Sequence, residues 1–195
     1  RRVLFRSKLV TTLPENAFKV FENNAEQKIS LFRREDIPVS LGIIVDNSGS
    51  IIAAQTLIAD TVNLTNAGEM SAQIVALAAS GTLTNSDAGW IDGVDTRIEA
   101  GSLNNTGRVY SDALSLKANT INNIRKGVIA SRGPLLIGAQ QLNNTEGGLI
   151  YSLGDMVMGG MIDANRQAQG DMQSLINASA KIESYANLQI DSAKI

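Results

Sequence analysis

Apolar and polar residues alternate in short segments from about position 42 onward, and the pattern restarts at intervals of about 20 residues. Most restarts contain an aliphatic residue followed two positions later by Asn, as in Leu103-Asn104-Asn105 and Leu142-Asn143-Asn144. The sequence numbers of successive Asn members differ by 19, 19, 20, 18, 21 and 33, so the last interval contains an insertion. The recurring residues are Asn47, Asn66, Asn85, Asn105, Asn123, Asn144 and Asn177.

Two further alternating segments follow each Asn. An aliphatic residue precedes a small one, as in Val109-Tyr110-Ser111, and a second alternating pair follows, as in Leu114-Ser115-Leu116-Lys117-Ala118. A period of two is typical of strands with one buried face. Three short strands cannot bury these faces within one repeat, but stacked repeats can. The sequence therefore predicts an all-β fold, a right-handed parallel β-helix with coils of about 20 residues.

The Asn column has a predicted structural role. Stacked Asn amides can donate to and accept from the same residue one coil away, and such ladders stabilise cross-strand arrays. Asn and the Gly that follows it also tolerate the left-handed backbone of a tight corner. The alternative is that Asn merely marks turns, but the constant aliphatic residue two positions earlier favours the ladder. The predicted turn glycines are Gly49, Gly68, Gly89, Gly107, Gly127 and Gly147.

The segment before the repeats differs in composition. Residues 1–7 resemble read-through of a sequencing adapter, and we expect them to be a non-native leader. Residues 8–40 contain three of the four Phe residues, and residues 1–40 carry eight basic and five acidic side chains. We expect residues 8–40 to be irregular or to cap the open end of the stack. Binding of a partner by this segment is the alternative.

Residues 41–195 form the predicted shaft, with an inserted loop at about residues 160–173. The insertion is polar and lacks a strand pattern, so we expect it to project as a loop or a short hairpin. Ile195 lies one repeat length after Leu175, where the next coil would begin. We therefore expect the sequence to be a piece of a longer array.

Composition excludes several kinds of chemistry. The 195 residues include no Cys and no His, which excludes zinc fingers, disulfide frameworks and nucleophiles that depend on these side chains. A net charge of −2 argues against a nucleic-acid interface. Apolar runs are too short to span a bilayer as a helix. No catalytic residue, metal site or cofactor is predicted.

One acidic segment contains the single Trp. Asp87, Asp92 and Asp95 surround Trp90, with Glu99 nearby, and carboxylates at such spacing are candidate calcium ligands. The repeats of calcium-binding solenoids are missing, so an exposed acidic bulge is the preferred interpretation. Trp90 is predicted to fill the core or a corner of its coil.

Exposed aromatics would support a binding function. Tyr110, Tyr151 and Tyr185 recur near the same place in their repeats and predict an outer tyrosine stripe, as expected of a receptor- or glycan-binding segment. The alternative is that they pack over neighbouring aliphatic residues. A polysaccharide-degrading enzyme, a third possibility, needs clustered carboxylates on one face, whereas Asp112, Glu146 and Asp155 occupy different places in their repeats.

Several stretches resemble the haemagglutinin repeats of filamentous-haemagglutinin-type proteins. These are the lines beginning at Leu103 and Leu142, the line Asn177-Ala-Ser-Ala-Lys-Ile-Glu-Ser, and the longer stretch from Met158 to Asn177. The similarity covers about residues 42–195 and includes the repeat length, the corner residues and the insertion.

The resemblance implies the structural shaft of a two-partner-secretion exoprotein, either an adhesin or a contact-dependent growth-inhibition protein, of a Gram-negative bacterium. Such a shaft is secreted or held at the cell surface, and it displays an adhesive tip or toxin located elsewhere in the chain. The implied partners are an outer-membrane transporter and a receptor on a host or neighbouring cell. The lack of Cys fits this route, because a disulfide formed in the periplasm would obstruct export.

Overall fold

The computed structural model describes residues 20–22, 25–27 and 44–195. The chain divides into two units, residues 1–40 and 41–195. In the first unit, β1 (Val20–Glu22) pairs antiparallel with β2 (Ala25–Gln27). The predicted leader, residues 1–7, lies outside the described residues, and so does most of the predicted capping segment 8–40.

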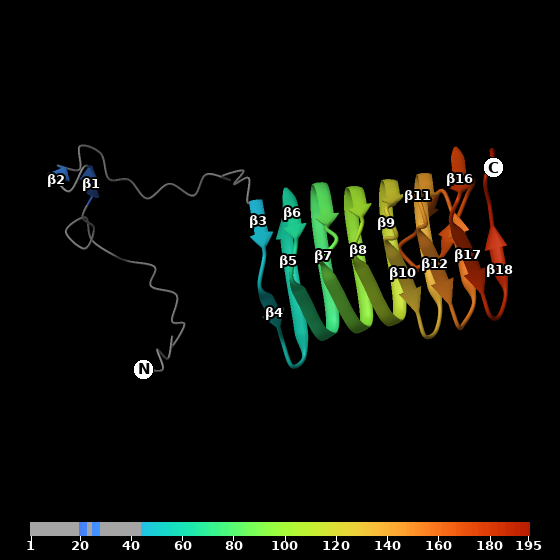
Figure 1. Ribbon diagram of the computed structural model, residues 1–195, viewed down its shortest axis with the longest axis horizontal. Coiled ribbons are helices and arrows are strands. Elements are labelled where there is room, and N and C mark those ends of the chain that lie inside the picture. Colours follow the sequence, from blue (N-terminus) through green and yellow to red (C-terminus); the bar gives the residue numbers. More distant parts are fainter. Residues whose placement is uncertain (1–19, 23–24, 28–43) are drawn as a thin grey trace. The chain divides into compact units, whose positions relative to one another are not determined.

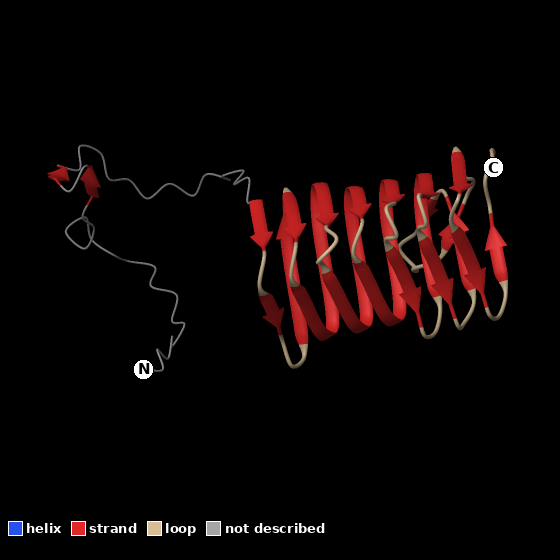
Figure 2. Cartoon of the chain, viewed as in Figure 1, coloured by secondary structure: helices blue, strands red, loops and turns tan. Residues whose placement is uncertain are grey.

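The second unit is a stack of parallel strands (Figures 1 and 2). Fourteen strands form one sheet, and every pairing within it is parallel. Each strand pairs with its counterpart in the next coil, which confirms the predicted parallel β-solenoid. The strands of this sheet are β3 (Ile44–Asn47), β4 (Ser50–Ile52), β5 (Thr56–Thr61), β6 (Asn63–Asn66), β7 (Glu69–Asn85), β8 (Trp90–Asn105), β9 (Arg108–Asn123), β10 (Val128–Ser131), β11 (Leu135–Thr145), β12 (Leu149–Ser152), β13 (Met156–Gly159), β16 (Ser174–Ala178), β17 (Lys181–Ser184) and β18 (Leu188–Ile190).

Each coil has three faces. The Asn face contains β3, β6, the ends of β7, β8, β9 and β11, and β16. The aromatic face contains β4, the beginnings of β7, β8 and β9, then β10, β12 and β17. The hairpin face contains β5, the middles of β7, β8 and β9, the beginning of β11, then β13 and β18. In β7, β8 and β9 the three predicted segments are joined into one long bent strand.

Aliphatic columns fill the interior. The residue two positions before each Asn is buried from Leu64 to Leu175, with at most 3% of its surface exposed. Further buried columns run through Met70, Ile91 and Val109 on the aromatic face and through equivalent positions on the hairpin face. A coil this narrow leaves room for Leu, Ile and Val but little for large rings, which explains the low aromatic content of 4%.

The insertion forms a short hairpin. β14 (Met161–Ile162) pairs antiparallel with β15 (Ala168–Gln169). A Cβ atom on Gly138 of β11 would collide with the backbone of Ile162, so the hairpin packs closely against the hairpin face at this glycine. Ile162 is buried there, with 8% of its surface exposed, and the Nε2 of Gln140 donates a hydrogen bond to the Gly160 carbonyl at 2.7 Å.

Candidate functional site

The Asn residues of the Asn face form a continuous ladder inside the stack. In each, the Nδ2 donates to the Oδ1 of its counterpart in the next coil, at distances of 2.7–2.8 Å from Asn47 through to Asn177. Asn66, Asn85 and Asn105 are fully buried, and their Nδ2 atoms also lie within hydrogen-bond distance of a backbone carbonyl in the next coil. Both amide hydrogens are therefore satisfied, and the ladder ties adjacent coils together at a corner that solvent does not reach.

A second, outer ladder runs beside the first. The Nδ2 of Asn122 donates to the Oδ1 of Asn104, and the Nδ2 of Asn143 donates to the Oδ1 of Asn122, both at 2.8 Å. These side chains are half-buried on the outer surface, and they donate toward the N-terminal end, opposite to the inner ladder. Sequence reasoning missed this ladder, although the repeated Asn-Asn doublets were a visible signal for it.

The corner glycines are required by close packing, not by a left-handed backbone. A Cβ atom on Gly68, Gly89, Gly107 or Gly127 would lie closer than 3.0 Å to the backbone of the preceding coil. None of these has a positive φ, so the expectation of a left-handed corner is wrong for them. Positive φ values occur in the turn itself, at residues such as Lys126 (65°).

One predicted glycine belongs to a different position. Gly148 precedes Leu149 as Gly127 precedes Val128, and a Cβ on Gly148 would collide with Asn144 and Asn123. Gly147 instead occupies the turn with φ of +81°. Gly49, in the first described coil, has open space around it. The corner glycine of this coil is therefore Gly148 and not the predicted Gly147, because β12 begins at Leu149, directly after Gly148.

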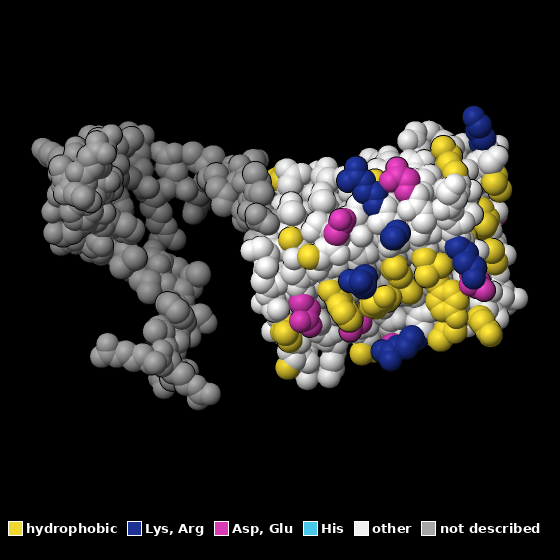
Figure 3. Space-filling model, in the orientation of Figure 1, with side chains coloured by type: hydrophobic (Ala, Val, Ile, Leu, Met, Phe, Trp, Pro, Cys, Tyr) yellow, Lys and Arg dark blue, Asp and Glu magenta, His cyan; other side chains and the backbone are white. Residues whose placement is uncertain are grey.

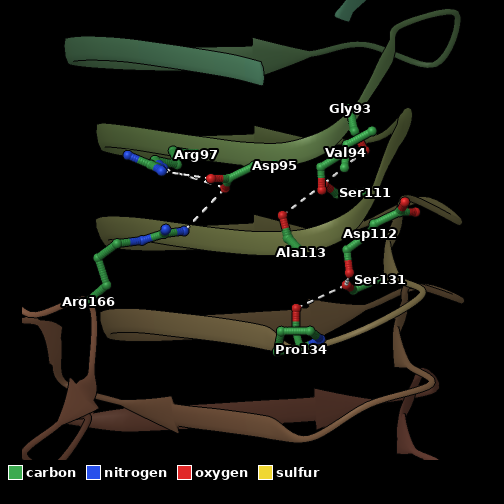
Figure 4. A network of polar contacts seen from close by, with 10 residues as sticks. All are labelled: Gly93, Val94, Asp95, Arg97, Ser111, Asp112, Ala113, Ser131, Pro134 and Arg166. Atoms are coloured by element: carbon green, nitrogen blue, oxygen red, sulfur yellow. Dashed lines mark hydrogen bonds and ion pairs between the residues drawn. The ribbon is translucent and has the colours of Figure 1, made fainter. Parts of the chain in front are cut away.

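Serines occupy the corner between the aromatic and hairpin faces. The Oγ of Ser111 lies 3.0 Å from the Gly93 carbonyl of the preceding coil and 2.8 Å from the Ala113 carbonyl of its own turn. Ser131 makes the equivalent contacts, with the carbonyls of Asp112 and Pro134 (Figure 4). Ser152 and Ser184 repeat the pattern. A second polar column thus bridges neighbouring coils.

The tip of the hairpin reaches back to an earlier coil. Arg166 donates to Asp95 of β8 at 3.2 Å, and Arg97 donates to the same carboxylate at 2.6 Å (Figure 4). The hydrogen bond from Arg97 lowers the pKa of Asp95, and the charge of Arg166 lowers it further. The same bond raises the pKa of Arg97. This ion pair links residues 71 positions apart in the sequence.

Trp90 lies on the outer surface, so the prediction that it fills the core or a corner is wrong. It is 43% exposed and packs edge-on against Tyr110, with ring centroids 5.7 Å apart. The reason is strand parity, because Ile91 continues the buried column between Met70 and Val109 and its neighbour must point outward.

The structure places two of the three tyrosines predicted for an outer stripe in one column, where both are half-buried. Tyr110 and Tyr151 share one outward column on the aromatic face, and Ala130 lies between them. Glu183 continues this column, whereas Tyr185 follows in the next turn and is 76% exposed. Tyr185 is out of register because it follows the corner serine, while the other two tyrosines precede theirs.

The acidic segment does not converge on one point. Asp95 pairs with Arg97, and Glu99 forms an ion pair with Lys117 of the next coil. Burial raises the pKa of Asp92, although the nearby Arg132 opposes this. Across residues 44–195 and the two short strands before them, no group of three or more carboxylates is placed to hold a metal ion. In the same described residues no helix has the length and apolar character needed to cross a membrane.

Comparison with protein families gives one match, and it covers most of the chain. The haemagglutinin repeat family matches residues 30–87, 91–157 and 152–195. Comparisons with curated proteins and with solved structures give no match. The matched stretches contain both Asn ladders, the hairpin and every corner glycine except Gly89. The chain belongs to the haemagglutinin repeat family and is a filamentous-haemagglutinin-type repeat region.

Proposed function

We propose that this chain is a section of the structural shaft of a two-partner-secretion exoprotein, and that it holds an adhesive tip or a toxin domain away from the cell surface of a Gram-negative bacterium. The observation that carries the proposal is the unbroken inner ladder from Asn47 to Asn177. It accompanies continuous parallel pairing on all three faces. Membership of a structural repeat family supports the same role.

The mechanism of the shaft is mechanical. Each coil adds about 4.8 Å to the length of the stack, the spacing of neighbouring strands. Backbone ladders, amide ladders and the aliphatic interior all repeat at that spacing, which makes the stack stiff along its axis. Since each coil contacts mainly its neighbours, the fold can grow coil by coil as the chain leaves an outer-membrane transporter.

Deletion of whole coils in the full-length exoprotein tests the proposal. Removing residues 86–105 joins Asn85 to Thr106 and preserves the register of every ladder. We expect the shortened protein to reach the cell surface, and its displayed rod to shorten by about 4.8 Å per coil removed. Electron microscopy of multiply deleted shafts measures the length, and surface proteolysis measures export.

A half-coil deletion is the matched control. Removing residues 86–95 joins Asn85 to Thr96 and places a hairpin-face segment where an aromatic-face segment belongs, so folding outside the cell should fail and surface display should fall sharply. Deletion of the partner transporter should abolish export of the intact protein. Equal display of the half-coil variant, or export without the transporter, would overturn the proposal.

A further inference from the structure

The outward positions of the aromatic face differ from those of the Asn face. On the Asn face they hold Thr65, Thr84 and the outer Asn ladder. On the aromatic face the central coils present mostly apolar side chains instead, although Arg108 lies between Trp90 and Val128. Figure 3 shows hydrophobic side chains gathered in a band over β10 and β12, with basic side chains at its margins. The band comprises Trp90, Tyr110, Val128, Ala130, Leu149 and Tyr151.

A hollow lies in this band between the two tyrosines. Tyr110, Ala130 and Tyr151 are directly opposite one another on β9, β10 and β12. The tyrosines therefore stand two strand spacings apart, roughly 10 Å. The small Ala130 side chain forms the floor between them. The hollow has a volume of about 520 Å³, and Val128 and Leu149 complete its walls.

Polar groups at the rim carry both signs of charge. Arg132 forms an ion pair with Asp112, and Asp92 also lines the hollow. Burial raises the pKa of Asp92, and the charge of Arg132 acts in the opposite direction. This rim has two carboxylates for one guanidinium, which disfavours a strongly anionic ligand. It suits a neutral ligand that has many hydrogen-bonding groups.

We propose that this hollow binds a neutral, extended glycan, with one sugar ring lying over Ala130 between Tyr110 and Tyr151. A pyranose ring has an apolar C–H face that packs on an aromatic ring and a rim of hydroxyls that can reach Asp92 and Arg132. Tyrosine offers the same combination of apolar body and polar tip. The column of Tyr110, Ala130 and Tyr151 follows the axis of the stack, so a linear glycan extends along it, with Trp90 beside Tyr110 at one side.

Glycan binding at one hollow is weak, and many copies of the chain on one cell surface strengthen it. The side chains project from strands fixed by pairing on both sides, so little ordering is needed on binding. A shallow site for one or two rings fits a dissociation constant of about 1 mM. Many copies at one cell surface would raise the apparent affinity through avidity. This inference adds to the shaft function, which stands whether or not a glycan binds.

Titration of the whole chain with cellotetraose and with chitotetraose tests the proposal. Trp90 is the single Trp and contacts Tyr110, so its fluorescence reports on the hollow. We expect a saturable change for at least one tetrasaccharide. Calorimetry should show that Tyr110→Ala and Tyr151→Ala weaken binding about 10-fold or more, equivalent to about 1.4 kcal/mol. Ala130→Phe should abolish it by filling the floor.

Tyr185→Ala is the matched control. It removes an exposed tyrosine outside the hollow and should leave the affinity unchanged. Circular dichroism checks that each variant keeps the fold, which is expected because all four side chains lie outside the core. The proposal is overturned if neither tetrasaccharide binds up to about 10 mM, ten times the expected dissociation constant. Undiminished binding by Ala130→Phe would overturn it too. The proposal is also overturned if sedimentation shows that the chain forms a concentration-dependent dimer and that Ala130→Phe abolishes this dimer.

Discussion

The two Asn ladders use the same side chain at the same spacing, but one lies in the interior and the other on the surface. Asn123 is fully buried and lies within hydrogen-bond distance of the next Asn and of a backbone carbonyl. Asn122 precedes it in the chain, is half-buried and bonds only to its counterparts in neighbouring coils. The two ladders look alike, but they are expected to contribute differently to the free energy of unfolding.

Desolvation is the main difference between them. When a surface amide loses its partner, water replaces the partner at little cost. When a buried amide loses its partner, the neighbouring groups remain without a hydrogen bond, and each costs about 1–3 kcal/mol. The inner ladder is therefore expected to determine stability and register, whereas the outer ladder adds a small increment.

The largest expected effect is that of Asn123→Leu. The substitution leaves the Nδ2 of Asn105 and the Oδ1 of Asn144 without their partners in the dry interior. We expect a loss of about 3 kcal/mol in the free energy of unfolding. Urea denaturation followed by circular dichroism measures it. A loss below about 1 kcal/mol would mean that water enters the corner and would remove the distinction between the ladders.

The corner glycines beneath the inner ladder give the next largest effect. A Cβ on Gly127 would collide with the Asn105 carbonyl, so we expect Gly127→Ala to destabilise the chain by about 2–3 kcal/mol through overpacking. Gly147→Ala is the matched control, because its Cβ has 3.3 Å to the nearest atom and only its φ of +81° is unfavourable. It should cost about 1 kcal/mol. Equal losses in thermal unfolding would show that backbone angle, not packing, selects these glycines.

The sequence predicts the fold and much of the interior because each repeat carries the same alternation. A Leu or Ile two positions before Asn identifies the inward residues, so the register of the inner ladder follows directly. The same parity would have placed Trp90 outside, since Ile91 continues a buried column. Parity does not separate Tyr185 from Tyr110 and Tyr151, because it lies two residues after their column; its place after the corner serine does.

Other features depend on contacts between coils and cannot be predicted from one repeat. Two adjacent glycines, Gly147 and Gly148, both fit the turn, and only the strand start at Leu149 identifies the corner residue. The direction in which the hairpin extends cannot be predicted from one repeat either. Polarity and length indicate a projecting element, but its return to Asp95 depends on the absence of a side chain at Gly138 and on Arg166.

Thr96 is a buried polar residue outside any ladder, and removing its hydroxyl should have the opposite effect on stability to removing a ladder amide. It is fully buried in the column between Val75 and Leu114, and its hydroxyl has no hydrogen-bond partner among the residues that the structure describes. We expect Thr96→Val to raise the free energy of unfolding by about 1 kcal/mol. Thr61→Val is the control, because the Oγ1 of Thr61 reaches the Ala78 carbonyl at 3.4 Å and should gain nothing. Destabilisation by Thr96→Val in the same urea assay would show that its hydroxyl is satisfied.

Substitutions in the outer ladder should change the free energy of unfolding only slightly. Asn122→Ala removes the hydrogen bonds to Asn104 and Asn143, but water can reach both amides. We expect a loss of about 0.5 kcal/mol, at the lower end for a side-chain hydrogen bond. The measurement is the same urea titration used for Asn123→Leu. A loss as large as that of the buried residue would show that stacking of amides, independent of burial, stabilises the solenoid.

The smallest expected effect is that of Asp95→Asn, which weakens an outer contact that belongs to no ladder. Arg97 and Arg166 lower the pKa of Asp95 in the folded chain. Their stabilisation is therefore complete above the unfolded pKa of about 3.9 and is lost as the pH falls through the lower folded value. Solvent screens the pair, since 44% of the Arg166 side chain is exposed, so the loss at pH 7 should be below about 0.5 kcal/mol. Burial raises the pKa of Asp92, which gives the opposite pH dependence, so both proteins are compared in an Asp92→Asn background. Thermal unfolding from pH 7 to pH 2 measures the difference. If it persists below the folded pKa, the side chain acts through packing, and charge has no part in holding the hairpin to β8.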